Sequence, residues 1–553
     1  MTTGRPAPIH YALAAVLLVH LPVVALVGDQ AWDDGAITLA FSRTLAEVGL
    51  FALTPVSPVV EGSSSLLFAG LNAGLHALLG LSFDGALLAS RALSAGFALL
   101  GCWLMAGLLT DLGESRARAA ALAGVVFILP MFLAETTNGM EMSLFACLLL
   151  GLVQAVRSGR DLLAVALIGL LLLTRFEACF YLGIALSIAF LTARGARLRV
   201  VGLIAAVIVL FAAIVAVRFS VFGELLPNTV LAKMNPPYSG TGLGASLFRR
   251  VEGMQELFAV LGAAAVPLAI AALPGWRRAL PLDAALLAGL MVSALAFAIV
   301  AGKNWGYSGR MVLGFVPLVF VALVWVLRAR MGEAARLLPP VPDAAVLALV
   351  AVVGVIASNL TLARNVVGTM AANLNTPAQS VTLTKLTQVY GTIAGPITPA
   401  TFASVGTAVS ALGDRLGLEE VTFLTPDVGG SALCCPGLRI IDIGGLASPE
   451  IGRHGYAVLP ELLAWERPDF ANPHSRFATA SGIFAMPSFT EGYAPVAYRG
   501  HLLWVRADHH AVLSEGAGSE PIEAVGQSGT LRFYRHPDPP LGTAGRTVTI
   551  LTD

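Results

Sequence analysis

The chain has 553 residues, of which 56% are hydrophobic and only 12% are charged. A soluble protein of this length needs far more charge on its surface, so the composition indicates a polytopic α-helical membrane protein. The formal net charge is zero. Nucleic acid is therefore excluded as a partner, because no basic surplus exists to meet its phosphates.

The first apolar run, residues 11–27, continues into polar sequence without a small-residue cleavage site. We therefore predict a retained first helix rather than a signal peptide. The five cysteines show no Cys-x-x-Cys or Cys/His metal spacing, which indicates neither a structural zinc site nor a disulfide framework. Among them, Cys434 and Cys435 are adjacent and lie outside the apolar runs.

Residues 30–67 follow this run directly and carry the paired carboxylates Asp33 and Asp34. From Ile37 onward the apolar residues have near-helical spacing, while Arg43 and Glu47 lie four residues apart on the opposite, wet face. Asp34 is suited to cap this helix by accepting a backbone N–H, but a cap explains one aspartate and not the second. Two carboxylates at the place where a span meets water indicate chemistry at the membrane surface.

The apolar segments predict about eleven transmembrane spans under the hydropathy-window rule. We assign to spans residues 11–27, 87–109, 119–134, 142–156, 162–174, 178–191, 200–217, 257–273, 284–301, 311–327 and 344–360. Residues 66–81 are also apolar, but this segment is short and contains Asn72 and His76. We predict that it lies along the outer surface as a juxtamembrane helix in the first outer loop.

The arginines set the orientation of these spans, because cytoplasmic loops carry an excess of positive charge. With residues 66–81 outside the membrane, most basic loop residues fall on one face, which we take as cytoplasmic: Arg5, Arg116, Arg118, Arg157, Arg160, Arg194, Arg197, Arg199, Arg277, Arg278, Arg328, Arg330 and Arg336. An odd number of spans then places the carboxyl-terminal part outside.

Acidic, amide and basic residues gather on the opposite face: Asp33, Asp34, Glu61, Glu135, Asn138, Glu141, Arg175, Glu177, Glu224, Asn228, Lys233, Lys303, Asn304 and Arg310. Arg175 and Glu177 lie in a turn too short to reach far from the bilayer. Ionisable groups at such depth normally point into a cavity or pair with each other. Both a mutual pair and a shared polar cavity are compatible with this pattern.

The character of the chain changes after Leu360, which divides it into a membrane domain, residues 1–360, and a soluble domain, residues 361–553. No span-length apolar run follows, and VTFLTPD, LRIIDIGG and TLRFYRH predict short strands. Helical patterns cover residues 380–390 and 400–416, so we expect an α/β or α+β fold. At roughly 190 residues this part is large enough for its own core. Polar or aromatic residues suited to sugar binding lie near the expected loop ends, although ordinary turn and core roles fit them equally: Asp427, Asp442, Trp465 and Tyr493.

Several motifs follow one another in a recognisable order. They are DDGAITLAFSRTLAEVG, VVEGSSSLLF, NGMEMSLFA, LLTRFEACFYL, FGELLPNTVLAKM and GYSGRMVLGFVPLV, then PDVGG, RIIDIGGLASPEIGR and ERPDF. Each is short, but their order along nearly the whole chain resembles the GT-C membrane glycosyltransferases, specifically those similar to the terminal β-(1→2)-arabinofuranosyltransferase of the mycobacterial cell wall.

The resemblance implies a polyprenyl-phosphate-linked sugar donor, a catalytic aspartate in the first outer loop, and inverting transfer at the extracytoplasmic face of a bacterial inner membrane. The acceptor is then a cell-envelope glycan or lipid, and the sugar is arabinofuranose or another pentose or hexose. A phosphate leaving group needs cations more than a strong acid, and the acceptor hydroxyl needs a base.

The resemblance also suggests roles for single residues. Asp33 is expected to be the base, and Asp34 is expected to orient it or a sugar hydroxyl. Lys233, Lys303 and Arg310 are the expected phosphate clamp, with Arg175 as a weaker candidate. Each cation is alternatively a snorkelling anchor. Other residues of the same motifs are expected around the donor phosphate or sugar: Glu61, Glu141, Glu177 and Asn228.

Two departures from the family pattern bear on specificity. Lys303 and Asn304 stand where a Gly-Asp pair is usual, and Arg175-Phe176-Glu177 stands where Arg-Pro-Glu is usual. The missing aspartate weakens any inference about the sugar or about a metal ligand. No convincing metal cluster is present, and a divalent ion on Asp33 and Asp34 would need further ligands.

Two other functional classes remain as alternatives. A transporter or flippase of lipid-linked or small solutes is also polytopic with buried charges, but it is expected to show paired halves or broken helices in matching positions, and the sequence shows no such symmetry. A non-catalytic scaffold has no need for so many ionisable residues on one face. An enzyme instead requires the aspartates and the Lys/Arg set to converge on one outward cavity.

Overall fold

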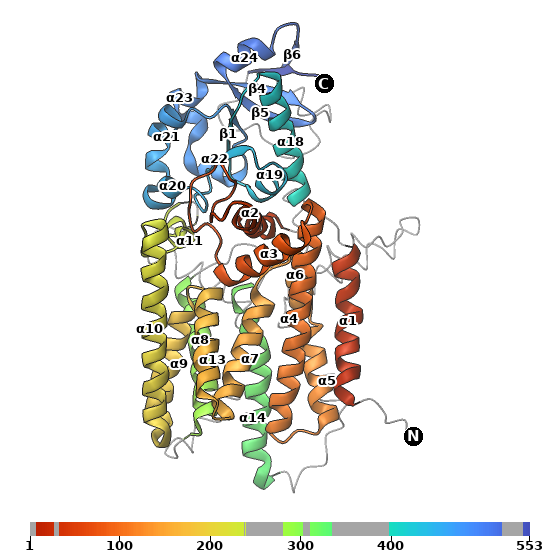
Figure 1. Cartoon of the computed structure of the whole chain (residues 1–553), viewed down its shortest axis with the longest axis vertical. Coiled ribbons are helices and arrows are strands. Elements are labelled where there is room, and N and C mark those ends of the chain that lie inside the picture. The colour runs from red at the N-terminus through yellow and green to blue at the C-terminus, as the bar shows by residue number, and fades with distance from the viewer. Residues whose placement is uncertain are drawn as a thin grey trace.

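The computed structural model describes residues 7–26, 32–236, 238, 280–301, 310–334, 398–521 and 546–552. A bundle of long helices forms the lower half of the molecule, and an α/β part forms the upper half (Figure 1). Helices α2 (Asp33–Val48) and α3 (Leu66–Leu79) lie between the two halves.

The helices of the bundle overlap the predicted spans that fall in the described residues, but the predicted span 119–134 is divided between two helices and the predicted span 311–327 begins in a 3-10 turn. They are α1 (Pro8–Leu26), α4 (Phe83–Asp111), α5 (Arg116–Phe127), α6 (Pro130–Asn138), α7 (Met142–Arg157), α8 (Asp161–Thr174), α9 (Ala178–Thr192), α10 (Arg197–Phe222), α13 (Leu282–Ala301) and α14 (Val316–Ala334). The 3-10 turns η1 (Arg194–Ala196) and η2 (Arg310–Phe315) precede α10 and α14. The predicted spans at residues 257–273 and 344–360 lie outside the described residues.

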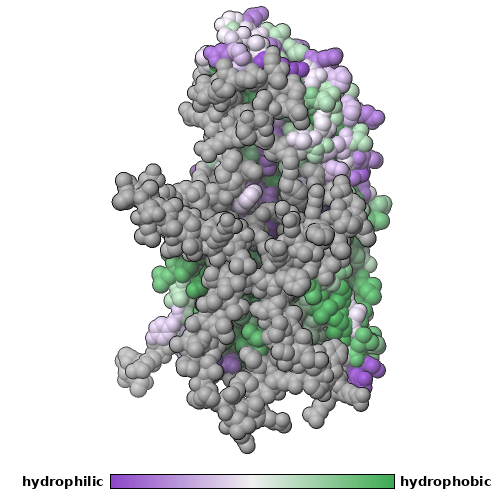
Figure 2. All heavy atoms as spheres, turned by 180° about the vertical axis from the view of Figure 1, so that it is seen from behind, coloured by the Kyte–Doolittle hydropathy of each residue, from purple (hydrophilic) through white to green (hydrophobic). Residues whose placement is uncertain are grey.

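Length and composition alone mark fewer of these helices as membrane-spanning. Among the described residues, two 29-residue segments are long and apolar enough, Phe83–Asp111 and Arg194–Phe222. The segments Arg116–Phe127 and Met131–Asn138 form a further candidate that is bent by 56°. The other apolar helices are shorter, so the number of spans stays a prediction. In Figure 2, hydrophobic residues cover the flanks of the lower half and hydrophilic residues gather over the upper half.

Aromatic side chains and small residues pack the bundle. Tyr181 on α9 stacks edge-on against Phe315 and Phe297 at centroid distances of 4.8 and 5.0 Å. Helix α13 crosses α9 so closely that a Cβ at Gly289 would lie 2.6 Å from the backbone of Ala185. Small residues at such crossings permit the close approach on which packing between apolar helices depends.

Helix α3 matches the helix predicted at residues 66–81. Its first turn is capped by Ser65, whose hydroxyl accepts the N–H of Phe68, and it ends at Gly80 in the left-handed region with a φ of 57°. It packs under α2 and lies across the top of the bundle (Figure 1). Leu78 and Leu79 at its end are exposed, as expected for a helix that rests at a membrane surface.

The upper half contains one mixed sheet in the order β2-β1-β3-β5-β4-β7-β6. Its strands are β1 (Val421–Thr425), β2 (Leu438–Asp442), β3 (Phe470–Ala471), β4 (Tyr493–Tyr498), β5 (His501–Arg506), β6 (Gly518–Pro521) and β7 (Thr547–Ile550). Strand β1 pairs in parallel with β2 and β3, whereas β4 and β5 form an antiparallel hairpin. The sequence motifs VTFLTPD and LRIIDIGG therefore form strands as predicted, and TLRFYRH lies outside the described residues.

Helices connect the strands and cover the sheet. They are α18 (Pro399–Arg415), α19 (Gly429–Cys434), α20 (Pro449–His454), α21 (Leu459–Glu466), α22 (Ser475–Ser481), α23 (Pro487–Thr490) and α24 (Ala507–Leu513), with the 3-10 turns η3 (Gly455–Val458) and η4 (Ile483–Ala485). Helix α18 matches the helix predicted at residues 400–416. The helix predicted at 380–390 and the domain boundary at residue 360 lie outside the described residues.

Helix α2 shares a hydrophobic core with this upper half. Ala36, Ile37 and Phe41 of α2 are buried in one cluster with Phe402 of α18 and Phe423 of β1. The first outer loop is therefore packed as part of the α/β half, although several hundred residues separate them in sequence. The amino end of α2, with its two aspartates, is positioned by this packing.

Candidate active site

Asp33 is the first residue of α2, and its carboxylate lies against the beginning of α19. The backbone N–H groups of Gly429 and Gly430 donate to its Oδ2 and Oδ1, both at 2.7 Å. The side chain is buried, with 2% of Asp33 exposed. Burial raises the pKa of Asp33 from 3.8 to about 7, against the two glycine hydrogen bonds, which lower it.

Asp34, the next residue, faces a different environment. Its Oδ2 accepts a hydrogen bond from Nη1 of Arg310 at 2.7 Å, and 43% of its side chain is exposed. Arg310 begins η2, which precedes α14. The pair therefore joins the first outer loop to a segment far along the chain. Of the two adjacent carboxylates, Asp34 is the one that a ligand can reach.

A buried ion-pair network continues from Arg310. Its Nη2 lies 4.0 Å from Glu141, which in turn accepts from Nη1 of Arg175 at 2.5 Å. Arg175 also donates from Nε and Nη2 to Glu177, at 2.8 and 2.5 Å. Arg175 and Glu141 are 3% and 1% exposed in their side chains. The mutual pair raised by the sequence is present, because Arg175 contacts Glu177, and Arg175 also joins a larger polar cluster through Glu141.

Lys233, at the end of α11 (Asn228–Lys233), lies beside the same groups, because the charges of Arg175, Glu177, Arg310 and Asp34 all act on its pKa. Desolvation is the largest cause, and the pKa is lowered to about 8. Within the described part of the chain, Lys233 is in no salt bridge. Lys233 is exposed, so an anionic ligand can reach its ammonium group.

The structure assigns other tasks to two residues that the sequence placed around the donor. Glu61 accepts two hydrogen bonds from Arg218 of α10, one from Nη2 at 3.0 Å and a shorter one from Nε, and both side chains are buried. The amide of Asn228 donates to the carbonyls of Gly445 and Leu446, each at 2.8 Å. Glu61 therefore ties the first loop to α10, and Asn228 holds the loop after β2. Lys303 lies outside the described residues.

Two of the four residues expected to bind sugar in the upper half are buried and hydrogen-bonded within the protein. Asp442 is 1% exposed, and its carboxylate accepts the N–H groups of Gly444 and Ala447. Tyr493 is buried, and its hydroxyl donates to the carbonyl of Pro468. Both residues therefore shape the fold and are not open to a sugar. Trp465 is 57% exposed on α21, which leaves it accessible.

Asp427 and the buried Asp442 both lie near the aspartates of α2, since Asp442 acts on the pKa of Asp33 and both act with Asp34 on that of Tyr238. Asp427 precedes Gly429 by two residues, and its Oδ2 lies 3.4 Å from Nε2 of His474. The imidazole stacks on Phe402 at a centroid distance of 5.5 Å and an interplanar angle of 14°. Burial raises the pKa of Tyr238, and the negative charges of Asp442, Asp34 and Asp427 raise it further. All three carboxylates therefore lie near the Tyr238 side chain.

Some functional candidates have only weak sequence signals. Arg218 ends an apolar run, and an arginine within a predicted span is itself a signal for a buried partner. Arg43 looked like the solvated member of a helical pair, but it donates to two carbonyls of α19. Nothing near His474 in the sequence indicates its contact with Asp427. Among the described residues, no group of three His, Cys, Asp or Glu side chains is arranged to hold a metal ion.

Comparisons with known proteins give distant likenesses only. No protein-family model matches the chain, and no curated protein does. The oligosaccharyltransferase of Archaeoglobus fulgidus in the apo form is similar over 90% of this chain and 74% of that one, at 10% identity and a TM-score of 0.48. ArnT from Cupriavidus metallidurans in the apo state is similar over 89% of this chain and 97% of that one, at 16% identity and a TM-score of 0.46. ArnT bound to undecaprenyl phosphate is similar over 82% and 79%, at 15% identity and a TM-score of 0.42.

The arrangement on the upper side of the bundle combines two chemical capacities. An accessible carboxylate, Asp34, can accept a proton from a hydroxyl group. Arg310 and Lys233, which lie next to it, can neutralise a phosphate or another anion. Placing a base and cations within a few ångströms of each other suits a group transfer in which an anion leaves.

Proposed function

We propose that the protein is an inverting glycosyltransferase that uses a polyprenyl-phosphate-linked sugar as donor. The acceptor is a cell-envelope glycan or lipid at the extracytoplasmic face of a bacterial inner membrane. The sugar is arabinofuranose or another pentose or hexose, in line with the motifs that resemble GT-C enzymes. No separate cofactor enters this proposal, and activity in the presence of a chelator decides whether a divalent metal ion takes part.

The observation that carries the proposal is the pair between Asp34 and Arg310, at 2.7 Å. It brings the acidic pair of the first loop to the cations from two other parts of the chain. Sequence distance alone gives no reason for Asp34, Arg310, Lys233 and Arg175 to meet. A transporter has no need of a base beside a phosphate-binding cation, whereas glycosyl transfer from a phosphate donor requires both.

The surroundings of the two aspartates support a different division of roles from the one expected from the sequence. Asp33 was the expected base, but its carboxylate is buried and occupied by two backbone N–H groups. Asp34 is exposed and adjacent to the cations, so we assign the base to Asp34. Asp33 then fixes the first turn of α2, on which Asp34 stands.

The proposed step is a single displacement at the anomeric carbon. The acceptor oxygen forms a bond to that carbon while its proton passes to Asp34. The bond from the anomeric carbon to the phosphate oxygen breaks, and its electron pair stays on the polyprenyl phosphate. Arg310 and Lys233 compensate the charge that develops on the leaving phosphate. Glu141 lies 4.0 Å from Nη2 of Arg310 and helps to position it, and Arg175 in turn contacts Glu141.

Asp427 and His474 are proposed to bind the acceptor. Both side chains are part-exposed, at 19% and 29%, and Asp427 is two residues from the glycine that contacts Asp33. A carboxylate and an imidazole can each accept or share a sugar hydroxyl proton. Asp442 and Tyr493 are left out of this role for the structural reasons given above.

The test is transfer by the purified protein in detergent, from a synthetic polyprenyl-phosphate sugar to an envelope glycan fragment. Arg310→Ala and Lys233→Ala are expected to weaken donor binding and to slow transfer, since a phosphate-binding cation acts in both ground and transition states. Arg199→Ala is the matched control, because Arg199 lies in the first turn of α10 and pairs with the half-exposed Asp161 of α8. Unchanged donor affinity in both Arg310→Ala and Lys233→Ala would contradict the proposed phosphate site.

A further inference from the structure

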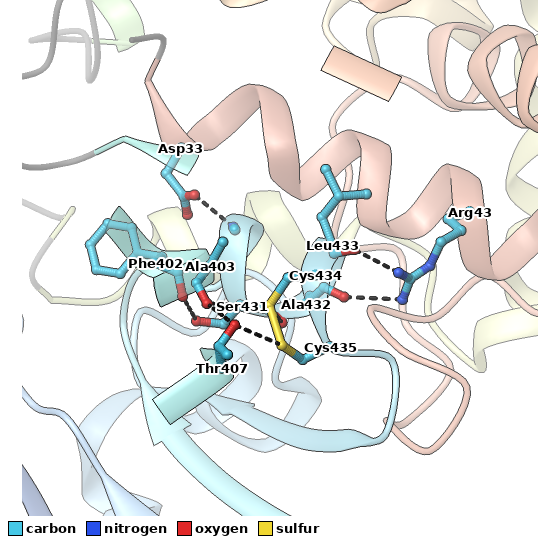
Figure 3. The surroundings of a disulfide bond; sticks show 11 residues. Asp33, Arg43, Phe402, Ala403, Thr407, Ser431, Ala432, Leu433, Cys434 and Cys435 are labelled. Atoms are coloured by element: carbon cyan, nitrogen blue, oxygen red, sulfur yellow. Dashed lines mark hydrogen bonds between the residues drawn. A yellow bond between two sulfur atoms is a disulfide. The ribbon is translucent and has the colours of Figure 1, made fainter. Parts of the chain in front are cut away.

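Helix α19 is hydrogen-bonded to α2 at both of its ends. At its beginning, Gly429 and Gly430 donate to Asp33. At its end, Leu433 and Ala432 accept from Nη1 and Nη2 of Arg43, at 2.6 and 3.1 Å. We call these four hydrogen bonds the α2–α19 contact; Figure 3 shows the two from Arg43 and one of the two to Asp33.

The signs of the charges match the groups that α19 leaves unsatisfied. The first N–H groups and the last carbonyls of a helix have no partner within it. A carboxylate meets the former and a guanidinium meets the latter, and both side chains are buried, with Asp33 at 2% and Arg43 at 8% exposed. Such charge-assisted hydrogen bonds are stronger than neutral ones. A helix of six residues is not stable by itself, so its place depends on these partners.

A disulfide between the adjacent residues Cys434 and Cys435 closes the carboxyl end of α19. The bond lies directly after the two carbonyls that Arg43 contacts, as Figure 3 shows. On the other side, the hydroxyl of Ser431 donates to the carbonyl of Phe402 in α18. The end of α19 is therefore fixed between α2, α18 and a covalent link.

We propose that α19 is a positioning element through which the upper half of the molecule determines the position of Asp34. Arg43 is a positioning residue, and the Cys434–Cys435 disulfide restrains the end of α19. The role of Asp34 in this inference rests on the proposed function. Asp33 fixes the beginning of α2 to α19 and Arg43 fixes it ten residues further along the helix, so the two contacts together oppose sliding and rotation of α2 under the upper half. Asp34, which follows Asp33 on the helix, is held in reach of Arg310.

The first experiment compares Arg43→Ala, Arg43→Lys and Glu47→Gln in the transfer assay. Glu47 is the exposed partner of Arg43 at 3.7 Å, so Glu47→Gln removes that ion pair and leaves the α2–α19 contact intact. In Arg43→Ala, kcat is expected to fall roughly ten- to a hundredfold, the usual cost of a misplaced catalytic group, at unchanged donor affinity. Arg43→Lys restores part of the activity, and Glu47→Gln resembles the wild type. An unchanged kcat in Arg43→Ala overturns the inference. A fall in kcat that only matches the loss of folded protein overturns it as well.

The second experiment uses a dithiol, which reduces Cys434–Cys435 to two thiols while it is itself oxidised to a disulfide. The other cysteines, Cys102, Cys147 and Cys179, are unpaired, so the reagent acts on one bond. The wild type is expected to lose activity on reduction. The double variant Cys434→Ser with Cys435→Ser is expected to have the lower activity from the start and to ignore the dithiol. Equal activity of the wild type with and without the dithiol overturns the role of the disulfide.

A third measurement separates this inference from the proposed function. Hydrogen exchange at the amides of Gly429 and Gly430 reports the contact directly, whatever reaction the protein catalyses. We expect these amides to lose protection in Arg43→Ala and to keep it in Glu47→Gln. Absence of transfer by the wild type would refute the proposed function, whereas unchanged protection in Arg43→Ala would refute the α2–α19 contact as a positioning element.

Discussion

Two adjacent aspartates at the start of α2 have opposite surroundings. Asp33 points into the upper half and is satisfied by backbone N–H groups, while Asp34 points toward Arg310 and solvent. Successive residues on a helix point about 100° apart, so neighbouring side chains meet different neighbours. One residue is then suited to holding the helix and the other to contacting a substrate.

The two residues are expected to differ in stability as well as in activity. Asp34→Asn removes the proton acceptor from an exposed position, so turnover should fall by about 10²-fold while the thermal midpoint stays the same. Asp33→Asn sets an amide N–H₂ against one of the two backbone N–H groups, and a buried donor left without an acceptor costs about 1–3 kcal/mol. Its thermal midpoint should therefore fall. Differential scanning fluorimetry with the transfer assay measures both quantities.

The opposite pattern would reverse the assignment. If Asp34→Asn retained near wild-type turnover while Asp33→Asn lost it at an unchanged thermal midpoint, Asp33 would be the base. The upper half would then have to open before each reaction, because the carboxylate of Asp33 is covered in this structure.

Two buried carboxyl groups predict how stability depends on pH. Burial raises the pKa of both Asp33 and Asp442 from 3.8 to about 7. The folded state then holds these protons more tightly than the unfolded state, so the stabilisation is complete below about pH 4 and is lost as the pH rises to about 7. The double variant Asp33→Asn with Asp442→Asn cannot ionise at these positions. Its thermal midpoint, measured between pH 4 and 7, should fall less steeply than that of the wild type, and an identical slope would contradict the raised pKa values.

At the scale of single residues, the sequence named residues that the structure brings together, while their individual roles stay predictions. The Asp-Asp pair, Arg175, Glu177, Arg310 and Lys233 follow from charge within apolar sequence. The roles depended on which way each side chain turns, and this is set by packing between α2 and the upper half. Asn228 and Glu61 were assigned to the donor because they belong to the same motifs, yet their polar atoms are used for bonds within the protein.

At the scale of elements, the closeness of α19 to α2 depends on a glycine. A Cβ on Gly429 would lie 2.5 Å from the carbonyl oxygen of Asp33 and 2.6 Å from the backbone nitrogen of Ile37. The two nearest atoms belong to the backbone and cannot move aside as a flexible side chain does, and Oδ2 of Asp33 would lie 2.9 Å away. The close approach of α2 therefore explains the glycine at position 429. A Cβ on Gly430 would instead lie 2.0 Å from the carbonyl oxygen of Pro399 in α18.

Gly429→Ala is therefore expected to destabilise the protein by about 1–3 kcal/mol, the usual cost of overpacking, and to lower turnover by moving α19 off α2. Gly437→Ala is the matched control, because a Cβ there meets nothing within 4 Å. Thermal unfolding and transfer rates of the two variants give the comparison. Equal thermal midpoints in both would show that α2 and α19 do not need this close approach.

Elements were predicted well where periodicity and caps agree. Helix α3 has Ser65 at its start and Gly80 at its end, and the apolar runs of the bundle gave helices at the expected positions. The vicinal disulfide was not foreseen, since adjacent cysteines match no common metal or disulfide spacing. The packing of α2 and α18 into one core was also not predicted, because local sequence patterns give no contacts between residues so far apart in the chain.

At the scale of the whole molecule, orientation rests on the arginines of the lower loops. The described loop arginines Arg157 and Arg199 lie at the end of the bundle remote from α2, where they pair with Asp283 and Asp161. A membrane around the bundle then leaves α2, α19 and the sheet on the other side. This is the side on which the prenyl-linked donor is proposed to be used.

The orientation predicts the behaviour of reporters fused after Asp553. Alkaline phosphatase, which folds only in an oxidising compartment, should be active, and a reporter that is fluorescent only in the cytoplasm should stay dark. The same pair of fusions placed after Arg160, in the loop between α7 and α8, should give the reverse result. A fluorescent carboxyl-terminal fusion would place the site on the cytoplasmic face and contradict the proposed topology.

The most direct measurement is the fate of the donor in a purified, reconstituted system. With a labelled polyprenyl-phosphate sugar and an envelope glycan acceptor, the account predicts release of polyprenyl phosphate and a new glycosidic bond of inverted anomeric configuration, both lost in Asp34→Asn. Mass spectrometry and nuclear magnetic resonance of the product determine the bond and its configuration. Movement of intact donor or solute across a proteoliposome membrane, without a new glycosidic bond, would contradict the account and favour a transporter.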